Sequence, residues 1–305
     1  RLVSLVTPGD ASFLQKHGIP IAAGSLAPSS RTVVARAIAN SHTVFSILSA
    51  LLFLPMIGIF ARFAARMPPL VNGDLDTEPH SRYLDFRVID TPSLAFVQAG
   101  SELKRMAKVA NSMVSDSIRQ FSGFDTKTES YIRQRENLLD VLQKDLSAFL
   151  VALARRSLSP EVAQEVPVLL STVNDLEDIG DNCEVILECL RRKKEENVYF
   201  SLAAMEEVVL VAKKAEGMMS TAVACIESSE CPDMVGALAL KNDILLSADA
   251  LKGNHLERLS TGDCTVIAGL LFMDIISAFA RIGETAYTII ETRSNFEDER
   301  ASGLD

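Results

Sequence analysis

Apolar residues recur at alternating spacings of four and three along one stretch of the chain, and this periodicity restricts the stretch to a long packed helix. The positions are Val162, Val166, Leu169, Val173, Leu176, Gly180, Cys183, Leu187 and Leu190. The stretch follows Ser159-Pro160-Glu161, which combines a capping serine, a proline at the first helical position and an early acid. Strand-like alternation of any length is absent from the sequence. The pattern therefore predicts an all-α body of bundled helices.

This body is internally duplicated. A shift of 103 residues aligns Asp178-Ile-Gly-Asp181 with Arg281-Ile-Gly-Glu284. A glycine within a helix costs about 1 kcal/mol relative to alanine, so its recurrence at one seam position indicates close approach of another helix. The sequence predicts a helical domain over residues 93–300, built from two three-helix bundles at about 93–193 and 196–294.

The front of the chain has a different character. Residues 1–66 contain six basic and one acidic side chain, which leaves about −15 of the total charge of −10 on the remainder. Residues 37–61 carry no charged side chain and are bracketed by Arg36 and Arg62. As a helix, this window crosses a hydrocarbon core of about 30 Å. A buried helix of a soluble domain is the alternative, but few such helices stay uncharged for this length.

We therefore expect a partial membrane domain over residues 1–70, with a span at about 37–61 in a lipid bilayer. A linker rich in proline, glycine and acids follows at 71–92. The acidic balance argues against nucleic acid as a partner, because neutralising phosphates requires an excess of lysine and arginine.

Carboxylates line one face of the helix that begins at Pro160. Glu177, Asp181, Glu184 and Glu188 are spaced at i, i+4, i+7 and i+11. Like charges at this spacing repel by some tenths of a kcal/mol, and oxygen-preferring metal ions would compensate. The alternative is a solvated acidic face with basic partners on a neighbouring helix. The second repeat carries a weaker echo, in which Ala280 replaces one expected acid and the acids are Asp274, Glu284 and Glu291.

Other classes of site lack their signatures. None of the four histidines follows a glutamate at the spacing of a di-iron oxidase. Glycine-rich nucleotide loops and a nucleophile elbow are also missing. The five cysteines show no CxxC pair, so we expect packing residues in a reducing compartment rather than a disulfide framework or a zinc site. We expect a protein that is not an enzyme.

Several stretches, in order, resemble bacterial-type sodium-dependent inorganic phosphate cotransporters. Residues 35–46 and 51–55 resemble the last conserved membrane stretch of that family. Residues 83–95 and 102–106 resemble its join to a cytoplasmic PhoU-like domain. Asp175-Leu-Glu-Asp-Ile-Gly-Asp181 resembles the acidic PhoU motif, whose carboxylates bind metal ions.

The resemblance implies the C-terminal portion of a sodium–phosphate symporter, multi-pass in its full-length form, in the cell membrane with its PhoU-like domain in the cytoplasm. Inorganic phosphate and Na⁺ are the implied substrates, and a second copy or a regulatory protein is the implied partner. The implied metals are divalent or iron-type ions. The candidate ligands are Glu177, Asp178 and Asp181, with Glu184, Asp274 and Glu284 as weaker candidates.

One departure from the family leaves an alternative open. The Gln-Ser-Ser motifs of the family's sodium and phosphate site are absent, so no residue here inherits a transport role. The alternative is a membrane-tethered PhoU-like regulator of phosphate uptake or signalling that has no transport activity of its own.

Overall fold

The structure is a computed structural model that describes residues 79–302, apart from 122, 229–232 and 263, together with Thr43, Phe45 and Ile47. The chain divides into two compact units, Arg1–Asp74 and Leu75–Asp305. The membrane span expected at about 37–61 lies outside the described residues except at those three positions, which are helical.

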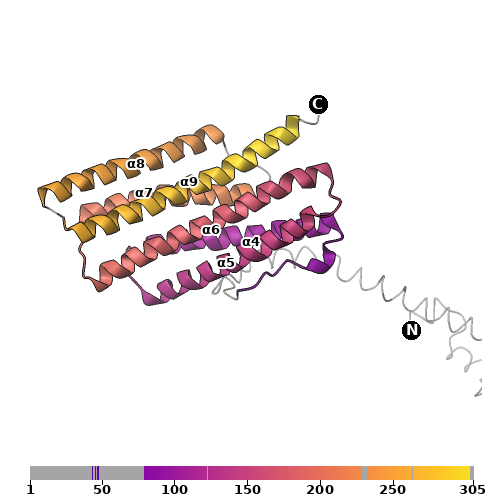
Figure 1. The fold of residues 1–305 in the computed structure, drawn as a ribbon, viewed down its shortest axis with the longest axis horizontal. Coiled ribbons are helices and arrows are strands. Elements are labelled where there is room, and N and C mark those ends of the chain that lie inside the picture. Colours follow the sequence, from indigo (N-terminus) through magenta and orange to yellow (C-terminus); the bar gives the residue numbers. More distant parts are fainter. Residues whose placement is uncertain are drawn as a thin grey trace, which may run out of the picture. The chain divides into compact units, whose positions relative to one another are not determined.

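The described part of the second unit consists of six long helices (Figure 1). After a short 3₁₀ turn, η1 (Phe86–Val88), they are α4 (Pro92–Arg119), α5 (Thr126–Ala154), α6 (Pro160–Glu195), α7 (Leu202–Glu227), α8 (Met234–Thr261) and α9 (Val266–Ser302). No strand occurs in the part of the chain that the structure describes, which confirms the all-α prediction. Helices α4–α6 form one three-helix group and α7–α9 the other, and the groups meet where α6 packs on α9 and α4 on α7.

Side-chain caps mark the starts of α5, α6, α7 and α8, whereas the residue before α4 makes no such hydrogen bond. Ser159 accepts a hydrogen bond from the Val162 amide at 3.4 Å, with Pro160 in the first turn, as predicted. Ser201 caps α7 in the same way, accepting from the Ala204 amide at 3.2 Å. These caps satisfy amides that have no partner within the helix, so each start is encoded locally.

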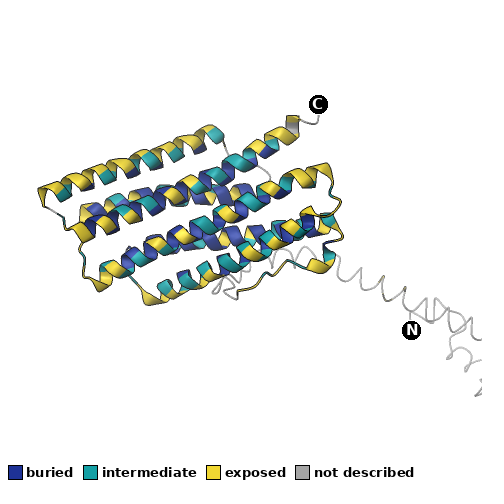
Figure 2. Ribbon diagram, in the orientation of Figure 1, coloured by how far each residue is buried: buried dark blue, intermediate teal, exposed yellow. Residues whose placement is uncertain are grey.

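The predicted seam forms the core of α6. Its positions from Val166 to Leu190 are all buried, and Val162 at the helix start is half-buried. Figure 2 shows the same inward-facing burial on the neighbouring helices. Helix α8 is the exception, because its buried residues are only Ala237, Ile244, Ala248 and His255.

Helix α9 shows that hydropathy alone does not identify a membrane span. Among the described residues, Val266–Arg300 is the one helix long and apolar enough to cross a membrane. However, 61% of its most apolar window is buried inside the helical body. Residues such as Phe272 and Phe279 are fully enclosed there, as in the core helix of a globular domain.

Two glycines let helices approach closely, as their recurrence predicts. A Cβ on Gly180 of α6 would lie 2.6 Å from Leu139 Cδ1 of α5. A Cβ on Gly283 of α9 would lie 2.8 Å from Ile244 Cδ1 of α8. Each glycine therefore sets the distance between the last two helices of its own bundle.

The segment before α4 is held on the domain by hydrogen bonds to a buried acid. Glu102 is fully buried and accepts hydrogen bonds from the amides of Arg82 and Tyr83 at 2.9 and 2.7 Å. Arg105 donates to Glu102 at 2.6 Å and to the His80 carbonyl at 2.7 Å. The described part of the expected linker is thus bonded to the domain.

The cysteines follow the sequence expectation only in part. Cys183 and Cys189 are buried free thiols, and burial raises their pKa values to about 12 and about 11. Cys225, however, is disulfide-bonded. It stands near the end of α7, where the chain leaves the helix. The expectation that all five cysteines are packing thiols is therefore wrong at this position.

Candidate metal centre

Three carboxylates converge between α5 and α6. Glu136 and Asp140 lie one turn apart on α5, and Asp181 lies opposite on α6. One oxygen from each lies within 4.8 Å of the others. The acids are placed by the packing described above, because Asp140 and Asp181 directly follow Leu139 and Gly180, which make the close contact between the helices.

The charges in this group repel one another. Burial first, and then the charges of Glu184, Asp140 and Asp181, raise the pKa of Glu136. Burial, followed by Asp140, Asp178 and Glu184, raises the pKa of Asp181. The pKa of Glu177, one turn earlier, is raised by burial and then by Asp181 and Asp140. An added cation would relieve this repulsion.

Basic side chains explain only part of the acidic face. Arg133 on α5 lies 3.3 Å from Glu184 and 3.9 Å from Glu188, so solvated pairing accounts for the C-terminal end of the face. Lys144 lies 3.3 Å from Asp140 in an exposed pair. Among the described residues, neither Glu136 nor Asp181 forms an ion pair. Basic side chains therefore do not account for this part of the acidic face.

The donor chemistry of the group favours hard cations. Three carboxylates and no imidazole or thiolate suit Mg²⁺, Ca²⁺, Mn²⁺ or iron rather than a structural zinc ion. Glu136, Asp140 and Asp181 could therefore hold such an ion, with Glu177 adjacent.

The predicted ligands do not all gather at one place. Asp181 belongs to the converging group and Glu177 borders it. The Asp178 carboxylate accepts a hydrogen bond from the Thr285 hydroxyl of α9 at 3.0 Å, so it contacts the other bundle. Asp274 and Glu284 are exposed on α9.

Sequence reasoning missed Glu136 and Asp140. The available signal was their four-residue spacing, which repeats that of Glu177 and Asp181. Spacing along one helix predicted one of the three acids, Asp181, and the other two required knowledge of the neighbouring helix.

The second repeat lacks the arrangement. Because Ile244 contacts Gly283 as Leu139 contacts Gly180, the matching positions on α8 are Lys241 and Leu245. On α9 they are Ala280 and Glu284. Lys241 Nζ instead lies 4.5 Å from the centre of the Tyr287 ring. Within the described residues, only the first bundle gathers three potential ligands.

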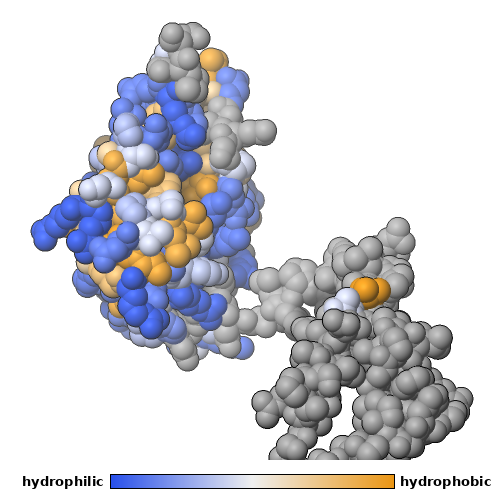
Figure 3. All heavy atoms as spheres, turned by 90° about the vertical axis from the view of Figure 1, so that its right-hand side faces the viewer, coloured by the Kyte–Doolittle hydropathy of each residue, from blue (hydrophilic) through white to orange (hydrophobic). Residues whose placement is uncertain are grey.

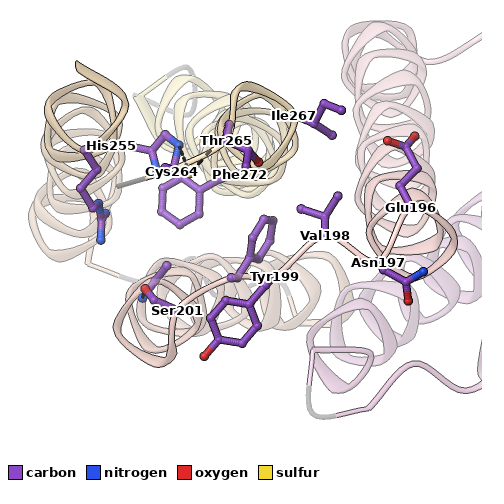
Figure 4. A pocket seen from close by; sticks show the side chains of 13 residues that line it. Glu196, Asn197, Val198, Tyr199, Ser201, His255, Cys264, Thr265, Ile267 and Phe272 are labelled. Atoms are coloured by element: carbon purple, nitrogen blue, oxygen red, sulfur yellow. Dashed lines mark hydrogen bonds between the residues drawn. The ribbon is translucent and has the colours of Figure 1, made fainter. Parts of the chain in front are cut away.

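A hollow of about 540 Å³ lies at one end of the second bundle, between the α6–α7 and α8–α9 connections (Figure 4). Its buried His255 stacks on Phe272 with ring centres 4.6 Å apart, and His255 Nε2 lies 3.6 Å from Cys264 Sγ. Arg258, also in the wall, is paired with Glu207 at 2.9 Å. Much of the polar lining is thus already engaged within the chain.

Comparison with known proteins matches the first bundle to a family. Residues 103–190, which run from α4 through α6, match the PhoU domain family. The chain contains a PhoU domain. The PhoU match covers the helices that carry Glu136, Asp140 and Asp181.

Solved PhoU structures show the same fold over both bundles. PhoU from Pseudomonas aeruginosa superposes with a TM-score of 0.62 at 17% identity, covering 68% of this chain and 99% of that chain. The phosphate transport system regulatory protein PhoU from Streptococcus pneumoniae gives 0.59 at 15% identity, covering 68% and 96%. The second unit is therefore PhoU-like in fold.

Curated relatives are larger proteins. "Putative inorganic phosphate export protein YjbB" of Escherichia coli K12 is 24% identical over 146 residues, which is 47% of this chain and 26% of that protein. Its namesake in Salmonella typhimurium LT2 is 22% identical over 143 residues, with the same coverage. The match spans about a quarter of the length of these relatives.

Proposed function

We propose that this chain is the C-terminal part of a membrane protein that moves inorganic phosphate by coupling it to sodium, and that its PhoU-like domain is a cytoplasmic regulatory part without catalytic activity. The observation that carries the proposal is the PhoU domain at residues 103–190 in a chain related to proteins named for phosphate export. An uncharged stretch at residues 37–61 precedes the domain. A membrane span at this stretch would attach the domain to the bilayer.

In this proposal the carboxylates of α5 and α6 bind a metal ion that links the two helices. Glu136, Asp140 and Asp181 would hold a divalent or iron-type ion, with Glu177 and Asp178 as neighbouring acids. Such an ion supplies positive charge at the contact between Leu139 and Gly180. The packing of the two helices holds them in register. A bound ion would make the first bundle more rigid, and this bundle would then present a fixed surface to a second copy or a regulatory partner.

The curated relatives and the family that the sequence resembles differ in the direction in which phosphate moves. The relatives are named for export, whereas the family resembled by the sequence couples inward sodium flow to uptake. In an alternating-access carrier, the imposed gradients determine the direction of net flux. The transport proposal therefore concerns sodium coupling and phosphate specificity, and not the direction of net flux.

The test uses the full-length protein in membrane vesicles from cells that lack other phosphate carriers. Radiolabelled phosphate flux is measured with a sodium gradient in either direction, and with potassium as the matched control. We expect flux that follows the sodium gradient. An absence of phosphate flux would contradict transport, and equal flux in potassium would contradict sodium coupling.

A tethered regulator without transport is the second candidate. It is favoured by the coverage of 99% of a PhoU chain, because the second unit then corresponds to a whole PhoU-like body. This candidate predicts that the chain changes the phosphate uptake of host carriers while its own vesicles show no flux. Deleting residues 75–305 without any effect on uptake would contradict a regulatory role.

A further inference from the structure

Arg293 is a buried cation without a partner. The residue is 9% exposed, and its Nε atom is buried with no hydrogen bond. Within the part of the chain that the structure describes, Arg293 donates no hydrogen bond and forms no ion pair. A guanidinium does not lose its proton at ordinary pH. Nε is the one Arg293 nitrogen that is both buried and unbonded, so the two terminal nitrogens are accessible to solvent and to an anion.

The Arg293 side chain lines a cavity of about 270 Å³ where α4, α6, α7 and α9 meet. Ser101 and Lys104 of α4 contribute to its wall, as does Ser228 at the end of α7. Lys104 Nζ donates to the Glu227 carbonyl at 3.1 Å, which leaves two of its three protons for another acceptor. Figure 3 views the domain from the right-hand side of Figure 1, and hydrophobic and hydrophilic side chains mix on that face.

Two glutamates line the cavity, and among the described residues neither forms an ion pair with Arg293. Glu227 at the end of α7 is instead paired with Lys108 at 2.7 Å. Burial raises the pKa of Glu165, and the opposing charges of Arg293 and Arg300 do not overcome that effect. Glu165 therefore lies near enough to Arg293 for their charges to interact, and as a carboxylate it would repel an anion bound in the cavity.

We propose that this cavity binds a small tetrahedral oxyanion of the phosphate class, held by Arg293 and Lys104. Its volume is below the range of drug-sized ligand pockets, and the planar guanidinium presents paired N–H donors that match two oxygens of one anion. Glu165 and Asp181 are 16 residues apart on α6, or about 24 Å along the helix. The anion site is thus separate from the metal centre and goes beyond the proposed transport function.

The experiment titrates the full chain in detergent with inorganic phosphate, sulfate and glycerol phosphate at constant chloride, using calorimetry. The test variant is Arg293→Gln, and the matched control is Arg281→Gln, an exposed arginine of the same helix. We expect saturable phosphate binding in the parent and the control, at least tenfold weaker in Arg293→Gln, and tighter in Glu165→Gln. Binding of free phosphate assigns the inorganic ion as the ligand, whereas binding of glycerol phosphate alone assigns a phosphate ester.

Thermal unfolding supplies an independent readout. Phosphate should raise the melting temperature of the parent and not that of Arg293→Gln, which should fold without anion because glutamine adds no charge to the cavity. The Glu136→Gln/Asp181→Asn double variant should keep the parental phosphate affinity, whatever the outcome of the flux test. No saturable binding by the parent, equal binding by Arg293→Gln, or loss of binding in the carboxylate variant would overturn the proposal.

Discussion

Gly180 of α6 and Leu139 of α5 pack so closely that a Cβ on the glycine would lie 2.6 Å from Leu139 Cδ1. The next residues along the chain, Asp181 and Asp140, bring their carboxylates together with that of Glu136. A contact between apolar atoms therefore sets the geometry of a polar site. This relationship links the packing of the first bundle to its candidate chemistry.

Gly180→Ala should destabilise the domain by about 1 kcal/mol, because overpacking a core costs roughly 1–3 kcal/mol and alanine recovers about 1 kcal/mol of helix propensity. The added methyl group must displace Leu139, which is 1% exposed. The matched control is Gly217→Ala on α7, where a Cβ would meet nothing within 4 Å. That change should stabilise the domain by about 1 kcal/mol. Urea unfolding measures both, and equal stabilisation by the two changes would refute the close-contact explanation.

Glu102→Ala should destabilise the domain by about 3–5 kcal/mol, the usual cost of breaking a buried charge pair. The change removes the carboxylate that accepts from Arg105 Nε and from the amides of Arg82 and Tyr83. Glu195→Ala removes an exposed partner of Arg191 and should change stability by about 0.5 kcal/mol or less. Hydrogen exchange at the Arg82 and Tyr83 amides should accelerate only in Glu102→Ala. Unchanged protection there would show that Glu102 does not fasten the segment.

Asp175→Asn should stabilise the metal-free domain at neutral pH and have little effect in acid. Burial and the charge of Asp178 raise the pKa of Asp175 from 3.8 to about 6. Because the folded-state pKa exceeds the unfolded one, the charged carboxylate opposes folding above pH 6, and the penalty disappears as pH falls below about 4. We expect a gain of about 1 kcal/mol at pH 7.5, since the group is partly exposed. Unfolding in chelator at several pH values measures the gain, and a gain that does not shrink with acid would contradict this assignment.

The sequence predicted what depends on local rules. The four-three spacing through Leu176 and the Ser159 cap act within one helix, so the start and the buried face of α6 followed directly. The glycine of the repeat was predicted to mark a close helix approach, and Gly180 and Gly283 confirm it. Each of these signals lies within a few residues of the structure that it specifies.

Contacts between distant residues were not available from spacing. Glu136 and Asp181 are 45 positions apart, and only the register of α5 on α6 unites them. Asp178 shares the helix and the motif, yet it turns to Thr285 of the other bundle. The amides that bond Glu102 come from a segment some twenty residues earlier, which has no helical periodicity that could predict this contact. Side-chain direction at these positions is a property of the assembled fold.

Divalent metal should stabilise the domain. A ligand present at a hundred times its dissociation constant adds about 2.7 kcal/mol, which corresponds to roughly 5–10 °C in melting temperature for a domain of this size. Adding Mn²⁺ or Mg²⁺ to chelator-treated protein should produce this rise, and lowering the pH should weaken it because protons compete for Glu136 and Asp181. A melting temperature insensitive to both metals would contradict loading of this site.

The central claim is that the carboxylates of α5 and α6 bind a metal ion, and metal content tests it most directly. The parent, Glu136→Gln/Asp181→Asn and the matched control Asp274→Asn/Glu284→Gln are dialysed against equal Mn²⁺ and analysed by mass spectrometry. Both control positions are exposed acids of α9. We predict bound metal in the parent and the control, and a loss of at least tenfold in the α5–α6 variant. Equal metal content in all three proteins would contradict the site.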